Sequence, residues 1–194
     1  MLASVPLKVI SASPVPSPVR HGDLVYLSRG YRGSPYMAIR PGGRGDVSKT
    51  HVVWHKPTGA SYSSSILYYD GLLYMTNEVG IVTCADARTG ERLWRHRLGG
   101  VFFASPVAGD GKIYVTGGAN SLSGVTENGI HPTRPHNVMA TVEEYDPAAN
   151  TWKTVRPLLL ARNHHVTVGV ADKLYVIGGR VGSAFISGTS NNVD

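Results

Sequence analysis

Histidines are the side chains most able to do chemistry in this chain, and one group of them lies in a polar stretch. His131 and His136 are close together there, with Glu127 and Arg134 beside them. Two imidazoles on one segment could meet at a metal ion, but no cysteine and no evident third ligand accompany them. We therefore predict no metal site, and we interpret Glu127, His131, Arg134 and His136 as candidates for contacting a binding partner.

A second group is the adjacent pair His164 and His165, which we expect inside a strand beginning at Arg162. Neighbouring residues of a strand point to opposite faces of the sheet, so these rings cannot share one ligand without a bulge. We interpret them as packing residues. The single cysteine, Cys84, excludes an intramolecular disulfide and lies in an alternating apolar pattern typical of a core residue. No catalytic residue, metal site or bound cofactor is predicted.

Charge and glycine patterns exclude several other functions. The formal net charge is +6, but the basic residues are scattered through expected loops without interleaved aromatic residues, which argues against nucleic-acid binding. The segment PGGRGD at 41–46 is rich in glycine, yet no Gly-Lys-Ser/Thr follows, so we predict no phosphate loop. No apolar run approaches the ~20 residues of a membrane span. Proline-rich residues 1–20 show no signal peptide, so the compartment stays open.

The elements that must position these residues are short strands. Glycine is frequent, charged residues make up 16% of the chain, and apolar runs are short, which favours an all-β protein with many turns. One unit recurs: a turn followed by a strand with a central tyrosine. We expect these strands at 24–28, 72–76, 112–116 and 173–177, marked by Tyr26, Tyr74, Tyr114 and Tyr175. Their spacing is typical of β-propeller blades, each a small four-stranded sheet.

The string TCADARTGERLW, residues 83–94, resembles the repeat of PQQ-like (quinoprotein-type) propellers. Matching positions are Asp86, Ala87, Thr89, Gly90 and Trp94. The resemblance implies that Thr89-Gly90 forms the turn between the third and fourth strands of a blade, and that Asp86 accepts hydrogen bonds from turn amides. Trp94 is expected to wedge between adjacent blades. A weaker copy carries Arg40 in place of the aspartate and ends at Trp54, so we expect its turn to differ.

The later part of the chain resembles a Kelch repeat. A glycine pair, Gly117-Gly118, follows one strand, and Tyr145 and Trp152 then occur on the next two expected strands in the string YDPAANTW. Between these elements, residues 119–137 are too polar and turn-rich for a strand, and we expect the irregular segment to extend to Val138. A second loop is expected at 180–192, after which a third strand of the last blade would begin at Val193.

We therefore predict an all-β fold, a partial β-propeller of about three and a half four-stranded blades. The expected divisions are an extension at 1–13, PQQ-like blades at 14–116 and Kelch-type blades at 117–194, with a hybrid third blade and an incomplete last one. Such a chain would be a natural fusion, a fragment or an engineered chimera. Its open strand edges would be completed by oligomerisation or by missing sequence.

Function is expected from the two resemblances rather than from a catalytic motif. They imply a non-enzymatic scaffold that binds a protein or other ligand through loops on one face, with homo-oligomerisation through open blade edges as a further expectation. Two alternatives stay open: a fragment of a propeller oxidoreductase, of the quinoprotein dehydrogenase or copper-radical oxidase type, and a chimeric or truncated propeller without evolved function. The PQQ-like resemblance favours an extracytoplasmic or periplasmic location.

Overall fold

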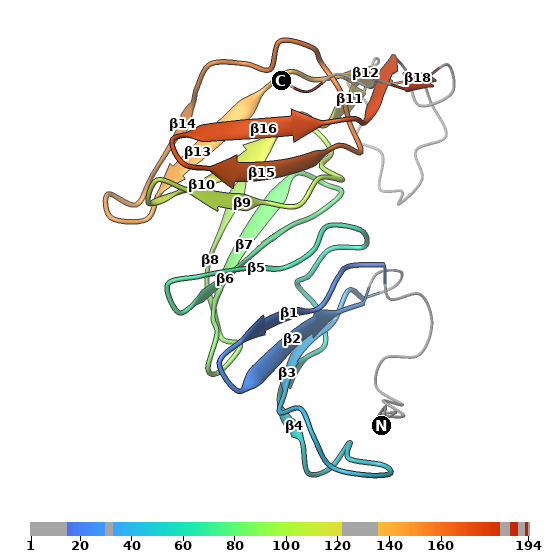
Figure 1. Cartoon of the computed structure of the whole chain (residues 1–194), viewed down its shortest axis with the longest axis vertical. Helices are drawn as coiled ribbons and strands as arrows, with labels where there is room; N and C mark the ends of the chain where they lie inside the picture. Colours follow the sequence, from blue (N-terminus) through green and yellow to red (C-terminus); the bar gives the residue numbers. More distant parts are fainter. Residues whose placement is uncertain (1–14, 30–32, 122–135, 183–186, 190–192, 194) are drawn as a thin grey trace. The chain divides into compact units, whose positions relative to one another are not determined.

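The computed structural model describes residues 15–29, 33–121, 136–182, 187–189 and 193 (Figure 1). Every regular element in these residues is a β-strand, and all the strand pairs are antiparallel. The chain divides into two compact units, Met1–Met75 with Thr83–Arg95 and Thr76–Val82 with His96–Asp194. Within the described residues, no helix has the length and hydropathy needed to cross a bilayer.

The first sheet has four strands in the order β1-β2-β3-β4. Tyr26 is paired with Val19 on one side and with Ala38 on the other, and Ala38 is paired with Trp54. The side chains of these paired residues therefore share one face of the sheet. The strands are β1 (Val19–His21), β2 (Leu24–Ser28), β3 (Tyr36–Ile39) and β4 (Val52–Lys56).

The second and third sheets repeat this plan. The second sheet has the strand order β5-β6-β7-β8. The third sheet has the order β14-β13-β10-β9, so its strands also lie side by side in the order in which they follow along the chain. The second sheet contains β5 (Leu67–Tyr69), β6 (Leu72–Thr76), β7 (Ile81–Asp86) and β8 (Arg92–Arg97). The third contains β9 (Val107–Gly109), β10 (Lys112–Thr116), β13 (Val142–Asp146) and β14 (Thr151–Thr154).

Among the described residues, the last blade forms a two-stranded sheet of β15 (Val166–Val170) and β16 (Lys173–Ile177). The predicted start of its first strand at Arg162 is wrong, because His164 has a positive φ of 52° that no strand residue adopts. The fold class is confirmed: the described residues form blade-like four-stranded sheets followed by an incomplete one.

Two segments predicted to be irregular contain short strand pairs. The polar stretch at 119–137 begins with β11 (Ala119–Ser121), which pairs with β12 (His136–Val138). The loop at 180–192 contains β17 (Arg180–Gly182) and β18 (Ser187–Thr189). The predictions were wrong there because a two-stranded ladder needs few apolar residues when backbone hydrogen bonds are its main contact.

The four tyrosines occupy equivalent positions. Each is the central residue of the second strand of its sheet: Tyr26 in β2, Tyr74 in β6, Tyr114 in β10 and Tyr175 in β16. Each is also paired with a residue of the preceding strand, Val19, Leu67, Val107 and Val168 respectively. A two-residue hairpin with positive φ at its first position precedes every one, at Gly22, Asp70, Asp110 and Ala171. The predicted repeat is confirmed at these positions.

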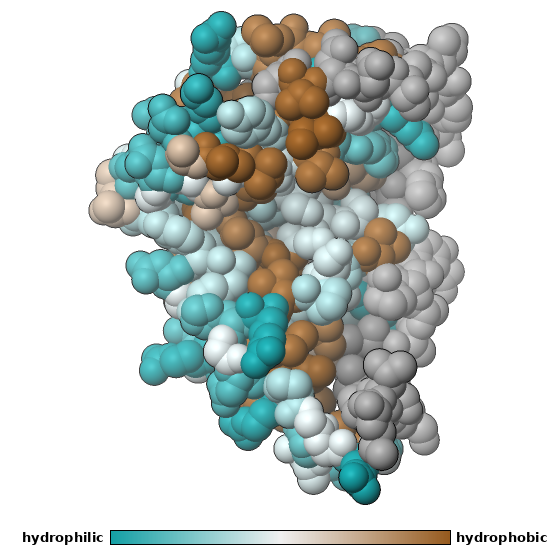
Figure 2. Space-filling model, in the orientation of Figure 1, coloured by the Kyte–Doolittle hydropathy of each residue, from teal (hydrophilic) through white to brown (hydrophobic). Residues whose placement is uncertain are grey.

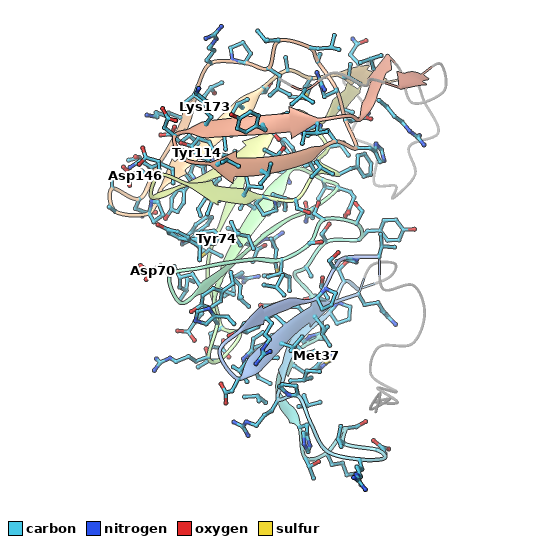
Figure 3. All side chains as sticks on the ribbon, viewed as in Figure 1. Met37, Asp70, Tyr74, Tyr114, Asp146 and Lys173 are labelled. Atoms are coloured by element: carbon cyan, nitrogen blue, oxygen red, sulfur yellow. The ribbon has the colours of Figure 1, made fainter. Side chains whose placement is uncertain are left out.

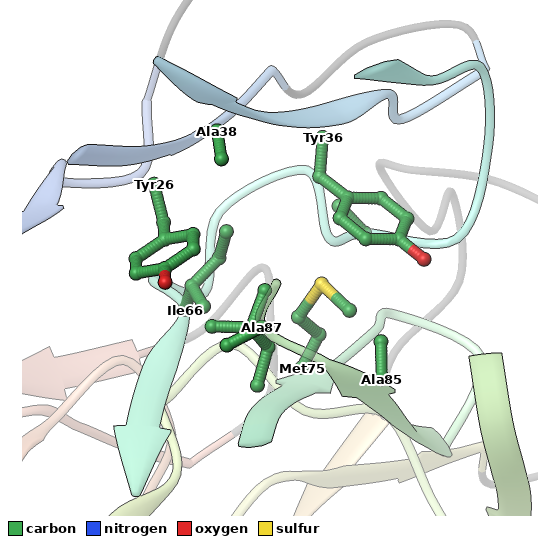
Figure 4. Packing of buried hydrophobic residues seen from close by; sticks show 9 residues of the cluster. Tyr26, Tyr36, Ala38, Ile66, Met75, Ala85 and Ala87 are labelled. Atoms are coloured by element: carbon green, nitrogen blue, oxygen red, sulfur yellow. The ribbon is translucent and has the colours of Figure 1, made fainter. Parts of the chain in front are cut away.

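The core of the first unit lies between two sheet faces (Figure 4). Tyr26, Tyr36 and Ala38 of the first sheet point toward Met75 and Ala85, and these side chains are all buried. Leu73 and Met75 lie on the face of β6 opposite Tyr74, because they alternate with it along the strand. The face that carries the repeat tyrosine of one sheet is thus covered by the opposite face of the next sheet.

Trp54 secures this packing at the turn of the second sheet. Its Nε1 donates a hydrogen bond to the carbonyl oxygen of Ala87 over 3.1 Å. A Cβ added at Gly90 would lie only 2.6 Å from the Trp54 ring, so the turn closes directly onto the indole. Trp54, the tryptophan of the weaker repeat copy, thus packs between its own sheet and the turn of the next one. The wedge role predicted for Trp94 stays a prediction. Trp94 meets the ring of Tyr74 edge-on, with centroids 6.1 Å apart.

Candidate functional site: the open last sheet

The last sheet is held to the third sheet through its inner face. Thr116 Oγ1 lies 2.8 Å from His165 Nε2 and 2.8 Å from the hydroxyl of Thr167, a polar contact buried between the two sheets. Gly169 lets the backbones approach closely, since a Cβ there would be 2.8 Å from the carbonyl oxygen of Ala108. Val176, on the same inner face, is almost completely buried. This face is therefore fixed, and the opposite face is turned away from the third sheet.

That opposite face, which we call the outer face, is apolar and exposed. Cross-strand pairing places Val166 beside Ile177 and Val168 beside Tyr175, with Val170 next in the row. These five side chains are between 37% and 66% exposed. Figure 2 shows apolar atoms gathered over β15 and β16 on the visible face of the molecule. A contiguous apolar patch of this kind typically marks an interaction surface.

The equivalent faces of two other sheets are covered. The face of the first sheet that carries Tyr26 packs against Leu73 and Met75. The face of the third sheet that carries Tyr114 and Thr116 packs against β15 and β16. Tyr175 is the equivalent residue of the last sheet, and no sheet covers its face among the described residues. Among the described residues, the outer face is thus equivalent to a blade-packing face but is not covered by a sheet.

One edge of the last sheet is open as well. Ile177 forms an antiparallel bridge with Val193. In the third sheet, the equivalent residue Thr116 is paired with Val142, where β13 begins. Val193 therefore has the position of the first residue of a third strand, as predicted. Along the rest of β16, from Lys173 to Val176, no described residue pairs with the edge that faces away from β15.

A cavity of about 530 Å³ adjoins this open edge. Tyr114, Thr116 and Val142 of the third sheet form one wall, and the edge of β16 forms another. The segment Val155–Leu159 closes a third side, and Arg156 with Lys173 places positive charge at the cavity. Figure 3 labels Tyr114 and Lys173, which come from β10 and β16 respectively. The space lies where a third strand of the last blade would pass.

Tyr114, in the cavity wall, is hydrogen-bonded to the carboxylate of Glu144. Burial and the neighbouring Glu144 carboxylate raise the pKa of Tyr114, so the phenol stays protonated at neutral pH and hydrogen-bonds with Glu144. Glu144 Oε1 in turn lies 2.9 Å from Lys153 Nζ. The wall thus combines apolar side chains with a hydrogen-bonded polar pair.

The residues predicted from the sequence as binding candidates fall largely elsewhere. Glu127, His131 and Arg134 lie outside the described residues. The backbone of His136 belongs to β12, where it is paired with Ser121. Their role in binding stays a prediction.

The two adjacent histidines reach different partners. His165 is buried against Thr116, and His164 stacks on Phe103 with ring centroids 4.3 Å apart. Cys84 is fully buried, and burial raises the pKa of its thiol to about 12, so almost no thiolate forms at neutral pH. His165 and Cys84 are thus buried packing residues, as the sequence predicted, whereas His164 is exposed and stacks on Phe103.

Sequence reasoning missed the outer face and the cavity. The alternation of Val166, Val168 and Val170 with Thr167 and Gly169 is visible in the sequence. A period of two normally places the apolar row toward the core, so the pattern alone assigns the valines to the wrong side. Here Thr167 and Gly169 face the third sheet, because this contact is a polar and close backbone approach, and the valines face away from it.

Comparisons with known proteins agree with the repeats. The family model PQQ_2, described as outer membrane protein assembly factor BamB, matches residues 43–181, which is more than half of the chain. Human Kelch-like protein 25 is 40% identical over 67 residues, 34% of this chain and 10% of that protein. The tetrathionate hydrolase of Acidithiobacillus ferrooxidans is 35% identical over 104 residues, 51% of this chain and 19% of that protein. The chain thus spans between a tenth and a fifth of these relatives.

Among solved structures, a europium-containing methanol dehydrogenase is similar over 75% of this chain and 24% of its own, with 18% identity and a TM-score of 0.47. The predicted resemblances to PQQ-like and Kelch propellers are confirmed by the family match and the Kelch-like relatives. The predicted boundary between the two repeat types, at residues 116 and 117, stays a prediction.

The described side chains do not fit a bound quinone of the kind that the repeat suggests. Quinoprotein dehydrogenases resemble this repeat but use adjacent cysteines and calcium-ligating acids, whereas Cys84 is the only cysteine. In the described part of the chain, no three His, Cys, Asp or Glu side chains come together in a way that could hold a metal ion. The donor set for such a cofactor is therefore missing from these residues.

Proposed function

Because the chain belongs to the PQQ_2 family of propeller repeats, described as outer membrane protein assembly factor BamB, we propose that it is a non-enzymatic interaction module. It binds another protein through the outer face of its last sheet. The observation that carries this proposal is the exposure of Val166, Val168, Val170, Tyr175 and Ile177 on a face whose equivalents are covered elsewhere in the chain.

The partner is a protein that presents an antiparallel β-sheet. In the first unit, the tyrosine-bearing face is covered by a sheet whose facing residues are Leu73, Met75 and Ala85. A partner sheet with medium-sized and small apolar residues in alternate positions reproduces this complementarity. Burial of such side chains contributes roughly 25 cal/mol per Å² of apolar area, so the outer face provides most of the driving force.

Site-specific photo-crosslinking tests the proposal. A benzoylphenylalanine residue replaces Tyr175 in the outer face, and the same residue replaces Val53 as a control, because Val53 is also an exposed strand residue but belongs to the first sheet. In cells that produce the protein, we expect a crosslinked second protein at position 175 only. Val168→Lys, beside Tyr175, should abolish this product without unfolding the chain, since Val168 is 41% exposed.

Two outcomes would contradict the proposal. The first is the absence of any crosslinked protein at position 175, or a crosslinked protein there that Val168→Lys does not remove. Either result would mean that the outer face does not bind a protein partner. The second is enzyme activity. Reduction of an artificial electron acceptor by the purified protein, supplied with pyrroloquinoline quinone and Ca²⁺, would favour the oxidoreductase alternative.

A further inference from the structure

We infer that the outer edge of β8 binds an extended acidic segment of another protein as an added antiparallel strand. β8 (Arg92–Arg97) is the last strand of the second sheet, and among the described residues no strand pairs with its outer edge. This edge belongs to the middle of the sequence, because the chain continues from β8 into the third sheet. The inference concerns a surface other than the outer face of the last sheet and goes beyond the proposed function.

The backbone of β8 is the first support. β8 has six residues, whereas the fourth strands of the first and third sheets, β4 and β14, have five and four. Alternate residues of an antiparallel edge strand direct their N–H and C=O groups away from the sheet, so half of the residues in β8 present both groups to a partner. Such an edge is a template for an added strand, whose affinity comes from main-chain hydrogen bonds.

The charge of β8 distinguishes it from the other two fourth strands. The single lysine of β4 forms an ion pair with Glu91, and the single lysine of β14 forms one with Glu144. Arg92 and Arg95 of β8 are exposed, and neither forms an ion pair within the described part of the chain. β8 itself contains no acidic residue. The positive charge of this edge is therefore available to a partner.

This charge determines which partner fits the edge. Pairing of β8 with a second copy of itself would bring arginines together, and like charges on neighbouring strands disfavour that pairing. An acidic strand meets the same arginines with opposite charge. Because exposed ion pairs are individually weak, the arginines select the partner and its register, and the backbone hydrogen bonds hold it.

The sequence of β8 also gives the pattern of the added strand. Residues directly opposite each other in an antiparallel pair lie on the same face of the sheet. Arg95 and Arg92 are therefore each matched by an acidic residue, and these two acids are three positions apart. Leu93, which is 55% exposed, is matched by an apolar residue directly before the second acid. The pattern of the partner is thus acidic, any residue, apolar, acidic.

A fluorescently labelled synthetic peptide, Thr-Thr-Glu-Thr-Val-Glu-Thr, has this pattern and is the probe. Fluorescence anisotropy follows its binding to the purified full chain, and we expect saturable binding. Two further peptides carry N-methyl groups on the odd or on the even residues. Only alternate N–H groups of an added strand face β8, so one of these two peptides should bind about tenfold more weakly or worse and the other should bind clearly better.

Two protein variants locate the peptide. We expect Arg95→Glu to weaken binding about tenfold or more. Arg44→Glu is the matched control, because Arg44 is also exposed and the change in net charge is the same, but Arg44 lies in the loop between β3 and β4. A peptide with lysine in place of its first glutamate should bind Arg95→Glu better than it binds the original chain, and this rescue excludes unfolding as the cause of the loss.

The inference is overturned if the peptide does not bind, if both N-methylated peptides bind as the parent does, or if Arg95→Glu and Arg44→Glu weaken binding equally. It is also overturned if a single-stranded oligonucleotide displaces the peptide and depends on Arg95 in the same way, because the edge would then be a general polyanion site. The proposed function is tested separately. The crosslink at position 175 should survive Arg95→Glu, and Val168→Lys should leave peptide binding intact.

Discussion

Asp86 and Asp146 form the same turn in two repeats of different sequence. The Asp86 carboxylate accepts hydrogen bonds from the backbone N–H groups of Arg88 and Thr89, both over 2.9 Å. The Asp146 carboxylate accepts the equivalent bonds from Ala148 and Ala149, over 2.9 and 3.2 Å. The PQQ-like and Kelch-type strings therefore share one physical device, an aspartate that satisfies the amides of a tight turn.

The turn at Asp146 makes stability depend on pH. The hydrogen bond from Lys112 Nζ, at 2.6 Å, and the Ala149 N–H hold the pKa of Asp146 below its ordinary value. A depressed carboxyl pKa stabilises the fold above about pH 4, and this contribution is lost as pH falls through the folded pKa. We expect the urea unfolding midpoint to fall as pH is lowered from about 5 to below the ordinary aspartate pKa of about 4, towards the lower pKa of the folded state. Asp146→Asn should flatten this dependence, and an unchanged slope would show that the turn carboxylate does not contribute.

The contact between Gly90 and Trp54 predicts a difference between two glycine substitutions. Gly90 and Gly71 both have positive φ, 69° and 78°, so alanine is strained at either position by roughly 1–2 kcal/mol. Only at Gly90 would the new methyl group meet the Trp54 ring, since nothing lies within 4 Å of a Cβ at Gly71. Overpacking of this kind adds about 1–3 kcal/mol. Chemical unfolding should therefore show a larger loss for Gly90→Ala, and equal losses would mean that Trp54 does not pack on the turn.

The hydroxyl of Thr116 joins the third and last sheets, and we expect its removal to lower the free energy of unfolding. Thr116→Val keeps the shape of the side chain but removes its buried hydrogen bonds with His165 and Thr167, which should cost roughly 1–3 kcal/mol of unfolding free energy. Thr116→Ser is the control, because it keeps the oxygen and loses one methyl group, at a cost of about 1 kcal/mol or less. Equal stability of the Val variant and the original chain would rule out the network as a stabilising contact.

Much of the fold could be predicted because its signals are local. The strands at 24–28, 72–76, 112–116 and 173–177 have the predicted bounds, since a hairpin with a glycine or an αL residue precedes each one. Turn chemistry at Asp86 and Asp146 is likewise set within five residues. Sequence reasoning therefore identified both the blade unit and its repetition.

The candidate site could not be predicted because its properties are not local. Exposure of Val168 and Tyr175 depends on the absence of a covering sheet in the described residues, which no window of sequence reveals. The cavity depends on how Val155–Leu159 passes beside β16, far along the chain from Tyr114. The short pairs β11-β12 and β17-β18 were missed because backbone bonds, and not apolar residues, define them.

Backbone hydrogen exchange of β16 is the measurement that tests the open last sheet most directly. β10 is paired on both edges, whereas the described residues pair with the second edge of β16 only at Ile177, so amides in Lys173–Ile177 should exchange clearly faster than those in Lys112–Thr116. Equal protection of the two segments in the chain alone would contradict the open edge.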